Sequence, residues 1–231
     1  DILPRLKIIE KNNLIKKIDY FLLPELKYSF QYETLQILNI PLQKILSNKK
    51  NRHVEADTLI VTNHPWYKKG HVRDEMINVP KWIIFWLREK FLINKISKNT
   101  YKKIYIDRSD SKFNHCKMIN PEEVWGFLKD KGFKKLKLTE INFKEQVSLF
   151  NNANIIIGAH GAGLTNIIFS NPGTKIIKIQ PKKQFNEFFK WVSKVNKLNY
   201  NRIVSKDLKL NIDNKPGDIL VDIKDIEKLL N

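Results

Sequence analysis

The sequence predicts an α/β fold in which the second part of the chain forms a Rossmann-like parallel sheet. From residue 103 onward, short apolar segments alternate with segments of helical spacing, and helices of that length between strands make right-handed crossovers. The run Ile155-Ile156-Ile157 is apolar without interruption, as in strands that are covered on both faces. Gly158 then opens a glycine-rich turn into a helix-like segment, which completes a strand–turn–helix unit.

The first part of the chain, residues 1–98, mixes helices with short strands and predicts part of another α/β domain. Apolar residues at helical spacing predict three helices, over 2–10, 32–38 and 82–91. Short apolar runs predict two buried strands, the first of them ended by Pro24, over 18–23 and 59–62.

The second part, residues 99–231, predicts a whole Rossmann-like domain. Its strands are expected over 103–106, 134–138, 154–157, 175–179 and 219–221. Its helices are expected after Asn120, after Asn142, and over 164–169, 185–195 and 223–230. Asn120 precedes Pro121, and Asn142 precedes Glu145 by three residues, so both Asn side chains are expected to cap helix N-termini.

The basic composition does not predict a nucleic-acid partner, although the formal net charge is +18. Of the 42 Lys and Arg residues only six are Arg, whereas the chain has 24 Asn and many Ile, a usage typical of A/T-rich codons. Proteins that bind nucleic acids favour Arg for bidentate contacts with bases and phosphates. Part of the charge is therefore attributed to codon usage, and only a weak preference for anions follows from it.

No metal or cofactor is expected. The single Cys excludes a disulfide framework and a thiolate metal cluster. The His residues outside the glycine-rich turn have no metal-ligand spacing, and the sequence contains no Asp-x-Asp. The longest apolar run, near 82–87, is far shorter than a membrane span, and the compartment is not predicted.

The glycine-rich turn at 158–163 allows two interpretations. A helix that begins directly after a buried strand presents backbone N–H groups and its dipole to an anion, most often a phosphate. Three glycines also serve a tight strand-to-helix turn that binds nothing. The spacing matches neither a dinucleotide fingerprint nor a P-loop. His160 favours the binding interpretation, because its ring can reach a ligand at the carboxyl edge of the sheet.

Arg108 follows the strand predicted over 103–106, again at a carboxyl edge. A guanidinium group there can bind a diphosphate through two parallel hydrogen bonds. A surface ion pair with Asp107 or Asp110 explains the same residue equally well.

Taken in order, these segments resemble glycosyltransferase family 61. The resemblance is carried by Tyr105 to Asp110, Asn120 to Val124, Glu145 to Phe150, and Gly158 to Asn166 with Phe169, Pro172 and Gly173. It extends over nearly the whole chain and is densest from 103 to 181. The opening segment, Asp1 to Leu6, resembles a family motif that normally follows a His-Trp pair, so the resemblance implies a chain truncated at its N-terminus.

The resemblance implies a GT-B-like enzyme built from two Rossmann-like domains. Residues 1–98 would be part of the acceptor-side domain, and residues 99–231 would be the domain that binds a nucleotide sugar. The expected partners are a nucleoside-diphosphate sugar and a glycan or protein acceptor. The expected reaction inverts the anomeric carbon without a metal or cofactor. A non-catalytic module that binds a glycan or nucleotide is the alternative.

The residues expected to bind the donor are carried over by position. Arg108 with its neighbour Ser109 would contact the diphosphate, and Lys117 stands where the family has a second Arg. Glu145 and Gln146 would shape the nucleotide pocket. The pyrophosphate would lie on the turn made by His160, Gly161, Ala162, Gly163, Leu164, Thr165 and Asn166.

The catalytic base is the least determined part of the site. His64 is preferred, because it follows the strand predicted over 59–62 at a carboxyl edge. Asp57, Asp74 and Glu75 occupy comparable segments of the first part and stay open as alternatives.

Overall fold

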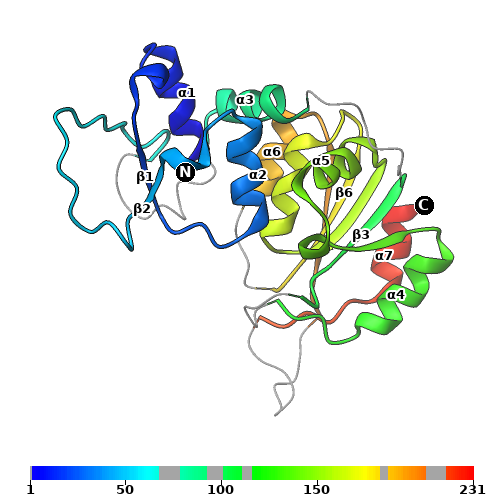
Figure 1. The fold of residues 1–231 in the computed structure, drawn as a ribbon. Coiled ribbons are helices and arrows are strands. Elements are labelled where there is room, and N and C mark those ends of the chain that lie inside the picture. The colour runs from blue at the N-terminus through cyan, green and yellow to red at the C-terminus, as the bar shows by residue number, and fades with distance from the viewer. Residues whose placement is uncertain (1, 68–78, 93–100, 111–115, 183–186, 207–216) are drawn as a thin grey trace. The chain divides into compact units, whose positions relative to one another are not determined.

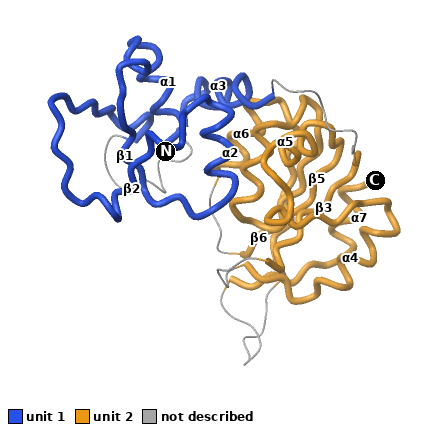
Figure 2. Tube along the Cα trace, in the orientation of Figure 1, with its two compact units in different colours: residues 1–94 blue, residues 95–231 orange. Residues whose placement is uncertain are grey.

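The computed structural model describes residues 2–67, 79–92, 101–110, 116–182, 187–206 and 217–231. The chain forms two compact units, unit 1 (residues 1–94) and unit 2 (residues 95–231), which Figure 2 colours separately. In the described part of the chain, no helix is both long enough and apolar enough to cross a membrane.

Unit 2 is built on a five-stranded sheet in which every pair of neighbouring strands is parallel. The strand order is β4-β3-β5-β6-β7, so the chain moves out to one edge and back to the other. The strands are β3 (Lys103–Asp107), β4 (Lys134–Lys137), β5 (Ile155–Ala159), β6 (Lys175–Gln180) and β7 (Asn199–Val204). This sheet confirms the predicted α/β class with a Rossmann-like parallel arrangement.

Helices cover both faces of this sheet (Figure 1). On one face lie α4 (Pro121–Asp130) and α7 (Ile223–Leu230), which contact each other. The 3₁₀ helix η5 (Ala162–Phe169) contacts both α5 (Phe143–Asn152) and α6 (Phe188–Val195) on the other. A short 3₁₀ turn, η4 (Leu138–Glu140), follows β4.

The central strands are buried from both sides, as the uninterrupted apolar run predicts. Ile156 and Ile157 are adjacent in β5, point to opposite faces and are both fully buried. Ile157 belongs to the core that packs on α4 and α7, together with Val124 and Ile226. Each fully buried Ile of this kind stabilises the fold by roughly 1.5–3 kcal/mol.

Unit 1 contains three helices and one pair of parallel strands among its described residues. Ile83, Ile84 and Trp86 of α3 are buried, so the apolar stripe predicted over 82–91 serves packing. The elements are α1 (Leu3–Lys11), η1 (Ile15–Lys17), β1 (Phe21–Leu23), α2 (Ser29–Ile37), η2 (Leu42–Lys44), β2 (Ile45–Ser47) and α3 (Lys81–Phe91).

The strand predicted over 59–62 is wrong. Leu59 and Val61 are 80% and 75% exposed, and the segment belongs to no sheet. The partner of β1 is β2, which pairs with it in register from Phe21 opposite Ile45. A short apolar run predicts burial only where a neighbouring strand exists to accept its hydrogen bonds, and periodicity alone does not show where that neighbour lies.

Two predictions at the far end of the sheet also need correction. The strand expected over 219–221 is a single bridge between Met118 and Ile219. The last strand is β7, a polar edge strand that the apolar pattern could not reveal because only Ile203 in it is buried. Two predicted helices differ in detail from the structure. The helix expected over 164–169 is the 3₁₀ helix η5. The helix expected over 185–195 is α6, which begins at Phe188, and residues 185–186 lie outside the described residues.

The two Asn residues expected to cap helices behave differently. Asn142 caps α5, since its Oδ1 accepts a hydrogen bond of 2.9 Å from the backbone N–H of Glu145. Asn120 stands at the start of α4 but makes no capping bond there. Its amide donates to the Val221 carbonyl at 2.8 Å, and its Oδ1 accepts from the Val221 N–H at 3.2 Å. Asn120 is therefore the N-cap residue of α4 by position, as predicted, but the capping bond expected of its side chain is absent.

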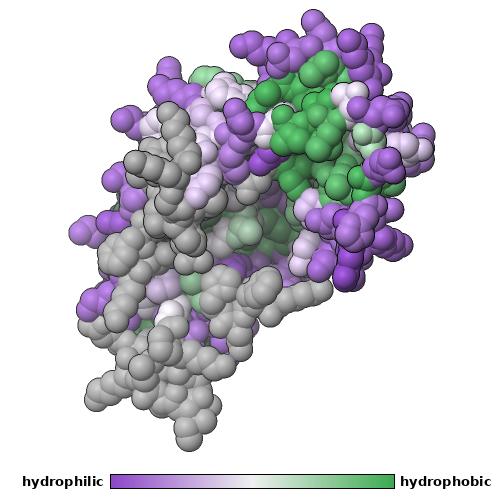
Figure 3. Space-filling model, turned by 90° about the vertical axis from the view of Figure 1, so that its left-hand side faces the viewer, coloured by the Kyte–Doolittle hydropathy of each residue, from purple (hydrophilic) through white to green (hydrophobic). Residues whose placement is uncertain are grey.

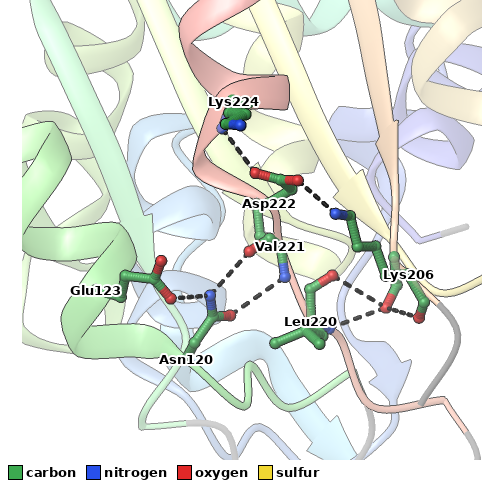
Figure 4. A network of polar contacts seen from close by, with 8 residues as sticks. Asn120, Glu123, Lys206, Leu220, Val221, Asp222 and Lys224 are labelled. Carbon is green, nitrogen blue, oxygen red and sulfur yellow. Dashed lines mark hydrogen bonds and ion pairs between the residues drawn. The ribbon is translucent and has the colours of Figure 1, made fainter.

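Figure 4 shows that Asn120 belongs to a polar network around the C-terminal segment. Leu220 exchanges hydrogen bonds with Ser205 and Lys206 at the end of β7, and Lys206 forms an ion pair with Asp222. Asp222 in turn caps α7 by accepting from the N–H of Lys224 at 2.9 Å. The network fastens the segment that leads into α7 to elements more than 100 residues earlier in the chain.

We expect Asn120→Ala to lower the free energy of unfolding by about 2 kcal/mol, because it leaves both polar groups of the Val221 backbone without their partner. Asn142→Ala, the matched control, removes only a helix cap and should cost about 1 kcal/mol. Urea denaturation measures both values. Amide hydrogen exchange at Val221 should accelerate in Asn120→Ala alone, and an unchanged rate there would contradict the assigned role of Asn120.

Candidate functional site

The predicted donor residues gather at the carboxyl edge of the sheet, where β3 and β5 end side by side. Ile106 of β3 pairs in register with Gly158 of β5, so the residues that follow these strands are neighbours. The Nη1 group of Arg108 donates a hydrogen bond to the backbone carbonyl of His160. The structure therefore places Arg108 in contact with the glycine-rich turn, two features that the sequence indicated separately.

The ion pair considered for Arg108 is not needed to explain its position. Asp107 forms an ion pair with Lys135 at 3.6 Å, and its two carboxylate oxygens accept from the N–H and hydroxyl groups of Ser109. Asp110 accepts a hydrogen bond from the hydroxyl of Thr139. Both carboxylates have other partners, and Arg108 contacts the glycine-rich turn.

The three glycines of the turn are distinguished by close approach and not by left-handed backbone angles. None of them lies in the left-handed region, and Gly161, with φ 169° and ψ 171°, is extended. A Cβ at Gly161 would lie 2.5 Å from Cζ of Arg108, so any other residue would collide with the guanidinium group. Gly163 would similarly meet the Leu138 side chain at 2.8 Å, and Gly158 would lie 3.2 Å from Cβ of Ile106. Close packing of this kind is compatible with a turn that binds an anion and with a tight turn that binds nothing, so both interpretations stay open.

His160 is held at both its backbone and its ring. Its N–H donates to the Ile179 carbonyl of β6 at 2.7 Å. Its ring meets the ring of Phe189 edge-on, with the centroids 5.6 Å apart. The peptide that receives Arg108 is thus fixed to the sheet on one side and to α6 on the other.

The helix after the turn presents its N-terminus to the same edge. Gly161 is the N-cap of η5 and supplies no capping side chain. Ala162 and Thr165 are exposed, whereas the Leu164 side chain is buried in the core. A ligand at this edge would consequently meet Leu164 through its backbone only.

Gln146, expected in the nucleotide pocket, and Asn166, expected on the pyrophosphate turn, bind each other. The Asn166 amide donates to Oε1 of Gln146 at 2.8 Å, and Nε2 of Gln146 donates to the carbonyls of Leu138 and Ile141, each at 2.8 Å. These bonds connect α5, η4 and η5. Glu145 is half-buried one residue earlier on α5.

Cys116 and Lys117 lie between β3 and α4 in the chain. The Lys117 carbonyl accepts a bond of 2.7 Å from the Ile219 N–H, and its side chain is exposed. Cys116 is buried, and burial raises the pKa of its thiol, while the charge of Arg108 and a hydrogen bond from it act in the opposite direction. Arg108 therefore lies beside Cys116 as well as beside the turn.

Lys178 is a charged residue near this edge that the sequence analysis missed. It stands in the middle of β6 and is only 1% exposed. Burial lowers the pKa of its ammonium group to about 8, with Arg202 acting in the same direction and Glu187 in the opposite one. The available signal was the Lys that interrupts the apolar segment Lys175–Gln180, a pattern that a search for apolar runs does not weigh.

His64 lies in unit 1 and caps a turn. Its Nδ1 accepts the N–H of Tyr67 at 3.0 Å, and its ring packs edge-on against Trp66 and Tyr67. Burial, followed by the charges of Arg5 and the N-terminal amine, lowers the pKa of this imidazole. The strand that motivated its choice does not exist. Of the alternative bases, Asp57 is exposed, and Asp74 and Glu75 lie outside the described residues.

A cavity in unit 1 and a possible metal site are the remaining candidates among the described residues. A cavity of about 410 Å³ lies in unit 1 between α1 and residues 60–63, and none of the expected donor residues lines it. Within the part of the chain that the structure describes, no three His, Cys, Asp or Glu side chains come together in a group able to hold a metal ion.

A parallel sheet with a basic side chain over a glycine turn at its carboxyl edge is the arrangement of nucleotide-binding α/β proteins. The chain belongs to glycosyltransferase family 61: residues 1–177 match the family model described as Glycosyltransferase 61. The matched range contains Arg108 and the whole glycine-rich turn.

Two plant enzymes are distant relatives. The chain is 30% identical over 133 residues to the β-1,2-xylosyltransferase RCN11 of Oryza sativa subsp. japonica, over 51% of this chain and 25% of the relative. It is 29% identical over 125 residues to a β-1,2-xylosyltransferase of Arabidopsis thaliana, over 46% of this chain and 23% of the relative. The similarity thus spans about a quarter of the length of each of these relatives.

We expect Gly161→Ala to displace the Arg108 guanidinium group, because the added methyl group and Cζ cannot both keep their places. The Nε–Hε resonance of Arg108 in a ¹⁵N correlation spectrum should shift or broaden. Gly126→Ala is the matched control, since a Cβ in that α4 position meets nothing within 4 Å. An Arg108 resonance that is identical in both variants would show that the turn does not hold the guanidinium group.

Proposed function

We propose that this chain contributes the donor-binding domain of an inverting glycosyltransferase, which moves a sugar from a nucleoside diphosphate to a hydroxyl of a glycan or protein. The observation that carries the proposal is the contact of the Arg108 guanidinium group with the His160 carbonyl over Gly161, in a chain of glycosyltransferase family 61. This contact brings a permanent cation to the N-terminus of η5, at the edge where ligands of α/β sheets bind.

The chemistry follows from where negative charge develops. When the bond between the anomeric carbon and the diphosphate breaks, the leaving group gains charge on its phosphate oxygens. A guanidinium group and the N-terminal amides of η5, fixed in advance by packing, stabilise that charge without reorganising during the reaction. Arg108 with Ser109 and the turn from His160 to Asn166 would perform this role, and Lys117 would add charge from an exposed position.

Gln146 and Asn166 would act mainly by holding the pocket in shape. Their amide groups bind each other and the backbone around η4, so they set the distance between α5 and η5. Glu145 precedes Gln146 and would contact the nucleoside.

Inversion requires a base that takes the proton of the acceptor hydroxyl as the diphosphate departs. We propose His64 of unit 1 for this role. Its lowered pKa favours the neutral imidazole near pH 7, which is the form that can accept a proton. In this proposal unit 1 is the acceptor-side domain, unit 2 binds the donor, and the complete enzyme follows the GT-B plan without a metal.

The relatives support a pentose as the transferred sugar, since both are named β-1,2-xylosyltransferases and xylose is a pentose. A hexose is the alternative that we retain. A second candidate function is nucleotide or glycan binding without turnover. The capping role of the His64 ring nitrogen favours it, because that contact accounts for the residue without catalysis.

Arg108→Ala should weaken nucleotide binding at least tenfold, because it removes the permanent charge beside the diphosphate. Thermal-shift and calorimetric titrations with uridine, guanosine and cytidine diphosphates measure the effect. Arg52→Ala is the matched control, since Arg52 is an exposed arginine of unit 1 and is not one of the expected donor residues. If no nucleoside diphosphate binds the unmodified chain, or if both variants bind equally well, the proposed donor site is wrong.

The pH profile of transfer tests the proposed base. Because the pKa of His64 is lowered from its ordinary value of 6.5, the neutral form predominates at pH 7, and the rate should fall only as the pH drops through that lowered pKa. His64→Gln should abolish this acidic limb and reduce kcat about 100-fold or more, with little effect on nucleotide affinity. Donor turnover that survives unchanged in His64→Gln would assign the base elsewhere, and absence of turnover with intact nucleotide binding would favour the binding module.

A further inference from the structure

Lys178 occupies an unusual place for a lysine. It pairs in register with Gly158 of β5 on one side and with Arg202 of β7 on the other. Residues in register share a face of the sheet, and the neighbours Ile177 and Ile179 point into the core beneath α4 and α7. The Lys178 side chain therefore lies on the opposite face, where it meets α6.

One aromatic ring connects this lysine to the turn. The Nζ atom of Lys178 lies 5.4 Å from the centre of the Phe189 ring, and Phe189 is itself buried. The same ring meets His160 edge-on at 5.6 Å. Lys178, Phe189 and His160 thus form a continuous row of contacts that ends at the carbonyl bound by Arg108.

A methionine of similar volume would pack here without the cost of removing a charge from water. Buried charges are expensive, and replacing them by apolar groups of similar volume is often neutral or stabilising. The position of Lys178 is therefore poorly explained as packing alone. A cation over an aromatic face attracts the ring, and this attraction is strongest where water is excluded.

We propose that Lys178 is a positioning residue of the donor site, whose buried ammonium group holds the Phe189 ring against His160 and so fixes the peptide that Arg108 contacts. This role rests on the proposed donor site. The positive charge also lies beneath the edge at which the diphosphate would bind. Lys178 is not required to touch the donor, and its effect reaches the donor through Phe189 and His160.

The charge of Lys178 makes the arrangement sensitive to pH. Its pKa of about 8 means that the ammonium group loses its proton as the pH rises from 7 to 9. The charged and titratable groups around it are Glu187 before α6, Arg202 on β7, Cys116 after β3 and His160 on the turn. The variant Lys178→Met separates the titration of Lys178 from that of these neighbours.

The first experiment needs no ligand. The Hε1–Cε1 resonance of the His160 ring is followed between pH 6.5 and 10 and is identified by its loss in His160→Gln. We expect an inflection near pH 8 that reports the titration of Lys178, and its absence in Lys178→Met. Lys134→Met is the matched control, because Lys134 also lies 5.4 Å from the centre of an aromatic ring, that of Tyr101, but at the amino end of β4. It should keep the inflection.

The second experiment measures binding of uridine, guanosine and cytidine diphosphates by calorimetry at pH 7 and pH 9. The affinity of the unmodified chain should fall with rising pH, and Lys178→Met should bind at least tenfold more weakly at pH 7, with a smaller pH dependence. No inflection at His160, or equal affinities of Lys178→Met and the unmodified chain at pH 7, would overturn the positioning role. An inflection without any nucleotide binding would leave Lys178 in contact with the turn but would refute the proposed function.

Discussion

The close approach of β3 and β5 is the constraint on which the candidate site depends. A Cβ at Gly158 would lie 3.2 Å from Cβ of Ile106 and 3.3 Å from the Leu164 side chain, so the strands and η5 pack at a distance that leaves little room for a side chain. This packing brings the ends of both strands together, and Arg108 and His160 become neighbours as a result. Core packing therefore determines where the site lies, and polar contacts act on groups that packing has already brought together.

Polar contacts then fix the groups that packing brings together. The Gln146–Asn166 pair holds α5 to η5, and the His160 N–H continues the ladder of β6 beyond the end of β5. Asn120 holds the C-terminal segment through the backbone of Val221. Each of these contacts satisfies a backbone or amide group that would otherwise be costly to bury, so stability and the shape of the edge have the same origin.

Much of unit 2 could be predicted from the sequence, because buried parallel strands are apolar without interruption and helix starts carry local signals. The segments over 103–106 and 154–157, and the cap at Asn142, were predictable for that reason. What failed depends on partners distant in the sequence. Residues 59–62 have a strand-like pattern but no neighbouring strand, β7 is a polar edge strand, and the Asn120 side chain binds a residue 101 positions away.

In the candidate site, as in the fold, features with a local sequence signal were predictable and their distant partners were not. The glycines at 158, 161 and 163 could be recognised, but the sequence could not show that they make room for Ile106, Arg108 and Leu138. The order of the motifs along the chain indicated the family, because several packing constraints of this kind are reflected in that order together.

The match to the family model ends at residue 177, one position before Lys178. The groups that surround the turn from the far side, among them Lys178 and Phe189, therefore lie outside the segment by which membership is established. The matched segment contains Arg108 and the glycine-rich turn, which we propose to bind the diphosphate. If Lys178 has the proposed positioning role, the residues beyond the matched segment would govern how firmly that turn is held and how its surroundings respond to pH. The proposed class of donor would then rest on family membership, whereas the rigidity and pH response of the binding edge would depend on the part of this chain after residue 177.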